Sequence, residues 1–332
     1  MATNPSVENY TLGRGRLFFA PYDNAGALTG ERALGNAPAF TFNMAIEKLE
    51  HYSSMTGLKA KDKSVVTQVT PALNFTLDEL SDENMNMLFF GTSSTITQAA
   101  DDYTLEVLTT SAELNRYYQV ATEARNIGIY KFTHGTITGT DFVVDEILTG
   151  TASTETATVR KVVDANTVYI SGVSGSFTAG EEVTGSVGSG TADLDAGTAE
   201  IWDTTDVVVF DGTSTYYDMT TDYTIDSVTG RVKIVGGGAI TAGTAVSVIY
   251  GTPADSYTKL AGLKITSIEG QLRFVSDYPE GPNMTLTAWK VNLTPDGDTA
   301  FIGDDWSTIS FTGEVLADEA GHPASPYLEI LL

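Results

Sequence analysis

Apolar and polar residues alternate with period two along most of this 332-residue chain, which is the pattern of strands with one buried face. The segments "TDYTI" and "RVKIV" flank "DSVTG", so we expect a hairpin at 221–235 whose turn is closed by Gly230. Further strands are predicted at 206–210, 245–250, 263–268, 271–275 and 285–293. Turn residues recur about every ten positions, as in sandwiches and barrels, so the fold class is expected to be mainly β.

One segment, "LSDENMNMLFFG", breaks the alternation and predicts a single α-helix. Ser81 suits the N-cap, two acidic residues follow it in the first turn, and Gly91 suits the stop. Apolar residues spaced at i, i+3 and i+4 give the helix one apolar face, which we expect to pack on a sheet. The residues of this face are Met85, Leu88 and Phe89.

The middle of the chain contains a weak duplication with an offset of 35 residues. "EILTG" at Glu146–Gly150 matches "EEVTG" at Glu181–Gly185, and "TATV" at Thr156–Val159 matches "TADL" at Thr191–Leu194. Two copies are too few for a solenoid, which needs about three or more. We therefore predict a small β unit that contains two related hairpins.

Basic residues become scarce relative to acidic ones from about residue 139 onward. This shift and the duplication predict a discontinuous core domain formed by 1–138 and 253–332. Residues 139–252 are predicted to be an inserted β region, either one domain or two, at 139–200 and 201–252.

The formal net charge of −25 argues against a protein that adheres to nucleic acid, because such proteins place Lys and Arg on phosphates. Two interpretations remain open, namely solubility alone and a surface that lies near DNA without sticking to it. Cysteine is absent, which excludes disulfides and thiol chemistry. The N-terminus lacks the pattern of a secretory signal, and no apolar run approaches the roughly 20 residues of a membrane span. We expect synthesis in a cytoplasm and no membrane partner.

No catalytic motif emerges from the sequence. His51, His134 and His322 lie far apart without metal-ligand spacing, and there is no nucleophile elbow or P-loop. Four carboxylates could ligate Ca²⁺, but the order of an EF-hand is missing and "PDG" is also a turn signal. These carboxylates are Asp296, Asp298, Asp304 and Asp305. The sequence gives no positive case for an enzyme, a cofactor or a metal.

Basic residues are few in this chain, but three of them, Lys59, Lys61 and Lys63, lie close together in the segment "SMTGLKAKDKSVV". If the segment is extended, the three lysines share one face. One interpretation is a solvated edge strand or loop whose lysines discourage unwanted pairing. The other is a basic patch that relieves like-charge repulsion where identical acidic subunits meet.

Three stretches together resemble the tail tube (major tail) protein of long-tailed, siphovirus-type bacteriophages. They are "NYTLGRGRLFFAPYD", the span from "GNAPAF" through "EKLEHYSSMTGLKAKDK" to "NMLFFG", and "IEGQLRFVSDYPEGPNMTLTAWKVNLTPDG". The resemblance covers roughly 1–138 and 256–320, and its most specific part is the order of the "EKLEH" segment, the lysine segment and the helix.

This resemblance implies a β-sandwich with one flanking helix, in which hexameric rings join their sheets into a barrel and stack into a tube for DNA ejection. It implies a structural protein of the virion tail that carries no cofactor. Its partners would be copies of itself and other tail proteins, such as tape measure, distal tail and terminator proteins, with double-stranded DNA passing an acidic wall transiently. The family's long loop reaches neighbouring subunits and rings, and here it would carry Lys48, Lys59, Lys61, Asp62 and Lys63.

The insertion at 139–252 departs from the family pattern and is expected on the outside of the tube. An alternative class stays open, because the Gly/Thr-rich duplicated unit also suits a β-rich virion fibre, a surface adhesin or a glycan-binding module.

Overall fold

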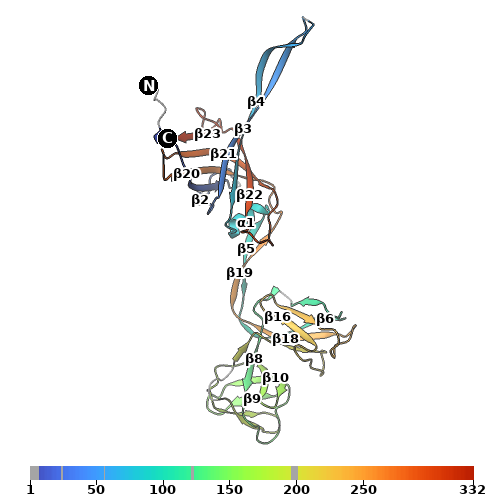
Figure 1. Ribbon diagram of the computed structural model, residues 1–332. Helices are drawn as coiled ribbons and strands as arrows, with labels where there is room; N and C mark the ends of the chain where they lie inside the picture. The colour runs from blue at the N-terminus through green and yellow to red at the C-terminus, as the bar shows by residue number, and fades with distance from the viewer. Residues whose placement is uncertain (1–6, 24, 56, 121–122, 196–200) are drawn as a thin grey trace. The chain divides into compact units, whose positions relative to one another are not determined.

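The computed structural model describes residues 7–23, 25–55, 57–120, 123–195 and 201–332 (Figure 1). The described chain is mainly β, with several antiparallel sheets and one α-helix. It divides into two compact units. The first unit comprises 1–95 and 258–332, and the second unit comprises 96–257. No helix in the described ranges combines the length and the apolar character needed to cross a membrane.

The first unit is built on an eight-stranded sheet in the order β2-β1-β20-β21-β22-β4-β3, with β23 also pairing with β21. Its elements are a 3-10 helix at Val7–Asn9, β1 (Gly15–Pro21), β2 (Arg32–Ala33), β3 (Ala39–Ser53), β4 (Ala60–Leu77), α1 (Asp82–Leu88), β20 (Ile268–Ser276), β21 (Thr285–Asp296), β22 (Ile309–Leu316) and β23 (Leu328–Leu331). Strands β5 (Thr92–Gln98) and β19 (Asp255–Ala261) pair with each other, and both boundaries between the units lie within them.

The core of the first unit lies on one face of this sheet. Alternate residues of β4 from Pro71 to Leu77 are buried, as the period-two pattern predicts. Phe75 stacks on Phe311 of β22 with ring centroids 5.3 Å apart, and Leu73, Leu272 and Leu293 are fully buried in the same cluster. These aromatic and aliphatic contacts between neighbouring strands hold the sheet in one register.

Three further sheets lie in the second unit, whose described residues form three hydrophobic clusters. Its strands are β6 (Asp101–Thr109), β7 (Tyr117–Gln119), β8 (Ile129–Thr133), β9 (Ile147–Gly150), β10 (Thr156–Asp164), β11 (Thr167–Ser171), β12 (Glu182–Gly185), β13 (Thr191–Asp193), β14 (Ile201–Asp203), β15 (Val208–Phe210), β16 (Tyr223–Asp226), β17 (Arg231–Ile234) and β18 (Val246–Thr252). Seven of them form one sheet, in the order β13-β12-β9-β10-β11-β8-β14.

The duplication detected in the sequence is a pair of related hairpins in this seven-stranded sheet. Strand β9 pairs with β10 through Leu148 and Ala157, and β12 pairs with β13 through the equivalent residues Val183 and Ala192. Strands β9 and β12 then pair with each other antiparallel, so the two hairpins are related by a local two-fold axis. All four of these apolar residues are buried, which explains why the duplicated positions keep their apolar character.

The expected boundary of the inserted region differs from the division of the structure, which begins at residue 96 rather than 139. The reason is that β6, β7 and β8 each pair with strands from later in the second unit, namely β18, β17 and β11. The charge shift at 139 does not coincide with a change of sheet, because β8 and β9, on either side of it, belong to the same seven-stranded sheet.

Most of the individually predicted strands are present, and one is not. The hairpin at 221–235 forms as β16 and β17, with Gly230 in the left-handed region at φ 65°. The segment 263–268 is not a strand before Ile268, because the N–H of Leu263 donates to the carbonyl of Phe89, and those of Lys264 and Ile265 donate to that of Phe90. These bonds close the end of α1 instead of extending a sheet.

Candidate assembly surface

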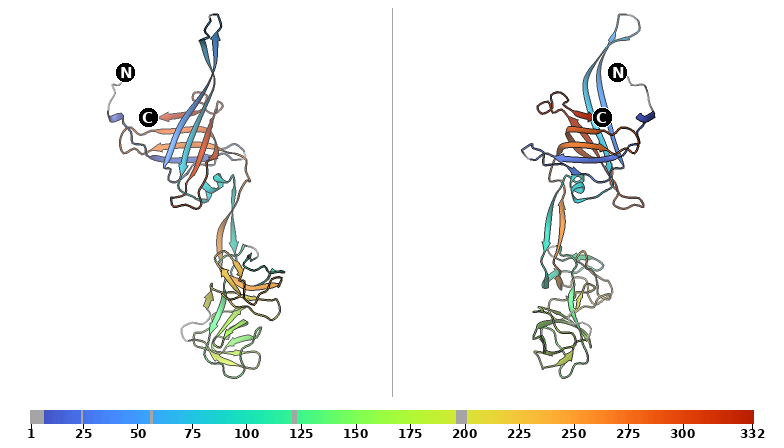
Figure 2. Two further views of the ribbon diagram at one scale, coloured as in Figure 1. Left: turned by 45° about the vertical axis from the view of Figure 1, so that its right-hand side comes forward. Right: turned by 90° about the vertical axis from the view of Figure 1, so that its left-hand side faces the viewer.

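The β3–β4 hairpin is the most exposed regular element of the first unit. Strand β4 pairs with β22 only as far as Ala72, opposite Glu314, and beyond that point it pairs only with β3. Pro71 comes immediately after this last pair, where a residue without an N–H costs no ladder bond to β22. We call residues 44–55 and 57–71 the arm. In Figure 1 and in both views of Figure 2 it projects beyond the ends of β20, β21 and β22.

One face of the arm is apolar and continues the core-facing side of the sheet. Phe42, Met44 and Ile46 of β3 lie opposite Leu73, Pro71 and Val69 of β4. Leu73 is buried in the core, whereas Phe42, Met44, Ile46 and Val69 are 43%, 49%, 48% and 39% exposed. The apolar face therefore runs out of the core onto solvent-exposed ribbon.

The opposite face of the same segment is polar and nearly uncharged. Thr41, Asn43 and Ala45 lie opposite Asn74, Ala72 and Thr70. The polar rows continue onto β22, where the hydroxyl of Thr312 donates to Asn74 over 2.9 Å. Nearer the tip this face becomes apolar, because the exposed side chains of Leu49 and Val65 lie opposite each other on it.

Two of the three lysines, Lys61 and Lys63, lie in strand β4, which begins at Ala60, and Lys59 comes just before it. The expectation that an extended segment would place the three lysines on one face is wrong. The register shifts between His51↔Lys63 and Tyr52↔Lys61, so Asp62 is an extra residue in β4. His51 and Tyr52 are consecutive and point to opposite faces, so their partners Lys63 and Lys61 do too.

Two of the residues predicted to contact other subunits, Lys61 and Asp62, instead pair with side chains of their own hairpin. Lys61 forms an ion pair with Glu50, and His51 Nδ1 lies 2.5 Å from Asp62 Oδ1. Hydrogen bonds from Lys61 and Tyr52 hold the pKa of the Glu50 carboxyl below its ordinary value. Because Glu50 is exposed, these contacts stabilise the hairpin only slightly.

The other lysines are available at the tip. Lys59 and Lys63 are exposed and make no ion pair with any residue that the structure describes. Lys48 is exposed as well, and it lies near enough to Glu50 to contribute to lowering the pKa of that carboxyl.

The helix forms with Ser81 as its N-cap, whose hydroxyl accepts from the N–H of Asn84, but it buries a different face from the one expected. Asn84 and Met87 are buried and Leu88 packs against the core, whereas Met85 is half-buried and Phe89 is 37% exposed. The cause is polar.

The Asn84 amide donates to the carbonyls of Leu34 and Glu79, and its oxygen accepts from Arg32, which turns that side of the helix inward. The left-handed residue after the helix is Phe90, at φ 47°, rather than Gly91.

The carboxylates and histidines that the sequence offered as possible metal ligands do not form a cluster in the part of the chain that the structure describes. Asp296 ends β21, and its Oδ2 lies 3.2 Å from the Thr312 hydroxyl oxygen. No group of three or more His, Asp or Glu side chains that could hold a metal ion occurs among the described residues. His134 is 2% exposed and its Nδ1 lies 2.8 Å from the carbonyl of Gly135, so it belongs to the interior of the second unit.

The apolar face of the arm is the feature that sequence reasoning missed. Its signal was present in "TFNMAIEKL", where Phe42, Met44 and Ile46 alternate with polar or small residues. Alternation alone predicts a half-buried strand, and it does not tell which part of that strand leaves the sheet.

A family model described as "Protein of unknown function UCP028589" matches residues 10–168 and 135–330. The two matched segments overlap over the first hairpin of the duplication and together span nearly the whole chain. No curated protein matches the chain. The chain belongs to the family of that description.

Proposed function

We propose that this protein is a structural subunit that assembles into stacked hexameric rings, forming the tail tube of a long-tailed bacteriophage. The observation that carries the proposal is the apolar face of the arm. The sequence resemblance supplies the ring and the tube, and the arm supplies a surface suited to contact between subunits. The protein would act without an active site, a cofactor or a metal.

The arm has the physical properties of a surface that becomes buried when another subunit binds. A two-stranded ribbon is marginally stable in water unless further strands or a packed face support it. Here the ribbon exposes large apolar side chains, among them Met44, Ile46 and Val69, in a row that continues the core. Contiguous exposed apolar surface of this kind marks sites of association. Burying it against another copy would contribute about 25 cal/mol for each Å² removed from water.

The sheet also offers an open edge for the same association. Strand β3 is last in the strand order, so along 15 residues its outer side has no partner strand in the described chain. Such an edge pairs readily with another chain. When the edge of one subunit binds a different surface of the next, the contact is head-to-tail. Repeating such a contact gives a closed ring if the rotation between neighbouring subunits divides a full turn evenly.

The charge of the chain fits a conduit for DNA. With a net charge of −25, the assembled wall would repel phosphates and let the genome pass without binding. The available lysines, Lys48, Lys59 and Lys63, lie on the arm, where they would meet carboxylates of a neighbouring subunit or ring. Lys61 and Asp62 would contribute by holding the tip of the hairpin together.

Sedimentation velocity over a range of protein concentrations tests the proposal. We expect a species of six subunits and larger assemblies to grow with concentration. A single species of 35.3 kDa at every concentration would contradict it. The alternative, an adhesin or glycan-binding module that acts as a dispersed monomer, predicts that second result.

A further inference from the structure

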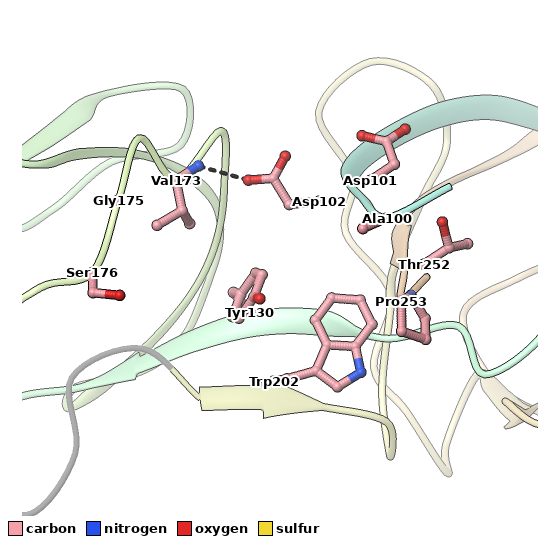
Figure 3. A pocket seen from close by; sticks show the side chains of 10 residues that line it. All are labelled: Ala100, Asp101, Asp102, Tyr130, Val173, Gly175, Ser176, Trp202, Thr252 and Pro253. Carbon is pink, nitrogen blue, oxygen red and sulfur yellow. Dashed lines mark hydrogen bonds between the residues drawn. The ribbon is translucent and has the colours of Figure 1, made fainter. Parts of the chain in front are cut away.

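The second unit holds a cavity of about 500 Å³ whose lining comes from five separate parts of its chain (Figure 3). Its most prominent side chains are Tyr130 of β8 and Trp202 of β14, with Asp101 and Asp102 beside them. The cavity lies entirely within 96–257, so nothing about it depends on the assembly of the first unit.

The two aromatic rings form a fixed platform. Tyr130 and Trp202 are direct partners in the pairing of β8 with β14, so their side chains project from the same face of the sheet. Their rings meet edge to face, with centroids 5.0 Å apart and planes inclined by 69°. Both side chains are only partly buried, which leaves ring surface for a ligand.

Two glycines hold the indole in place. Gly128 and Gly251 bond to each other through both backbone groups, at 3.2 and 2.8 Å. A Cβ atom on Gly128 would lie 3.0 Å from the Trp202 ring, and one on Gly251 would lie 2.9 Å from it. The absence of side chains at these two positions lets the indole pack on backbone, and the ring is ordered before any ligand arrives.

The carboxylates are also fixed by the protein. Asp102 Oδ2 accepts from the N–H of Val173 over 2.6 Å, and Asp101 accepts from the N–H of Tyr103 and the hydroxyl of Thr104. Within the described chain, the second oxygen of Asp102 carries no hydrogen bond. An ionised carboxylate only accepts, so this site suits a ligand that donates from hydroxyl groups.

We propose that this cavity binds an uncharged saccharide. The apolar C–H face of a pyranose ring would stack on Trp202, and its hydroxyls would donate to Asp102 and Asp101. An anionic ligand is disfavoured, because two carboxylates and no cationic side chain line the cavity. An ammonium ligand is the competing occupant, because the two carboxylates would attract it, and the titration separates the two classes.

The test is isothermal titration of the full chain with methylammonium chloride and with uncharged methyl glycosides of glucose, galactose, mannose, N-acetylglucosamine and rhamnose. We expect at least one of them to bind. Trp202→Ala should weaken that binding by about tenfold or more, because a large aromatic anchor dominates such contacts. Asp102→Asn, which keeps the shape of the side chain but loses its charge, should weaken binding by a smaller factor.

A matched control is Trp306→Ala, since Trp306 is 93% exposed in the first unit and should leave binding unchanged. Trp202→Phe keeps an aromatic ring and should retain part of the affinity, which separates loss of stacking from loss of folding. Absence of binding to every glycoside would overturn the proposal. Equal binding by wild type and a folded Trp202→Ala would do so as well, as would preferential binding of methylammonium.

Discussion

Glu146 and Glu181 occupy equivalent positions in the two related hairpins of the second unit, and each buried carboxylate accepts N–H groups from the loop of the other hairpin. Glu146 accepts from Val187 over 3.2 Å, and Glu181 accepts from Ala152 and Ser153 over 2.9 and 2.8 Å. Each also accepts from the N–H three positions before it, at 2.6 Å in both cases. The duplication thus conserves a reciprocal pair of loop anchors.

Replacing Glu181 with Ala should destabilise the second unit by about 1–3 kcal/mol, because three partly buried N–H groups lose the buried carboxylate that accepts from them. Hydrogen exchange of peptides from 143–194 measures this as faster exchange. The control is Glu182→Ala, which changes an exposed neighbour of the same type and should have little effect. Equal exchange in the two variants would show that the carboxylate does not anchor the loops.

The same carboxyl predicts a dependence on pH. Burial by itself raises the pKa of Glu181, but hydrogen bonds from Ser153, Thr178 and Ala152 outweigh it and hold the pKa below its ordinary value of 4.5. A carboxyl with a lowered folded-state pKa stabilises the fold above its ordinary pKa, and that stabilisation disappears as pH falls through the folded-state pKa. Urea midpoints measured by circular dichroism at pH values from 6 to 3 should therefore fall more steeply for wild type than for Glu181→Gln. Parallel curves would refute this assignment.

The sequence predicted the duplication and the 221–235 hairpin because both depend on local pattern. Gly230 at a positive φ and the alternating residues around it are visible within fifteen positions. The boundary of the second unit was not visible, because it depends on the pairing of β6 with β18 and of β8 with β11. Pairing across such separations leaves no mark in the local charge or in the turn residues.

This division predicts how the second unit can be removed. Joining Gln98 to Asp255 through a short Gly/Ser linker should leave the first unit folded, because β5 and β19 already pair there. Removing only 139–252 should instead give insoluble protein, because β6 and β7 would lose their partner strands. Solubility and circular dichroism of the two deletions decide the point. A soluble, folded 139–252 deletion beside an insoluble 99–254 deletion would contradict the division.

The arm illustrates a different limit of sequence reasoning. Strict alternation predicted one face for Lys59, Lys61 and Lys63, but the extra residue Asp62 reverses the faces of β4 from that point. A bulge of this kind has no reliable sequence signature when the added residue is polar and exposed. In the same way, the inward side of α1 was decided by the hydrogen bonds of Asn84 rather than by its apolar spacing.

Reversing the charge of the available arm lysines should impair assembly without unfolding the subunit. The variant is Lys48→Glu, Lys59→Glu and Lys63→Glu, all exposed positions. Each pair across an interface is worth only about 0–1 kcal/mol, but the contacts repeat around every ring and along the tube. We expect shorter tubes or none by electron microscopy, with an unchanged circular dichroism spectrum.

The control for this charge reversal changes Arg14, Arg16 and Lys264 to Glu, which alters the net charge equally at exposed positions of the first unit outside the arm. Tubes of normal length from the control and short tubes from the arm variant would assign the effect to the arm. Equal shortening in both would attribute it to net charge alone.

Negative-stain electron microscopy of the purified chain beside two variants tests the central proposal most directly. Ile46↔Val69 and Ala45↔Thr70 are adjacent cross-strand pairs on opposite faces of the arm. We predict six-fold rings or tubes from wild type and from Ala45→Asp/Thr70→Asp, and dispersed subunits from Ile46→Asp/Val69→Asp. Dispersed wild-type monomers at high concentration, or normal tubes from Ile46→Asp/Val69→Asp, would contradict assembly through the apolar face of the arm.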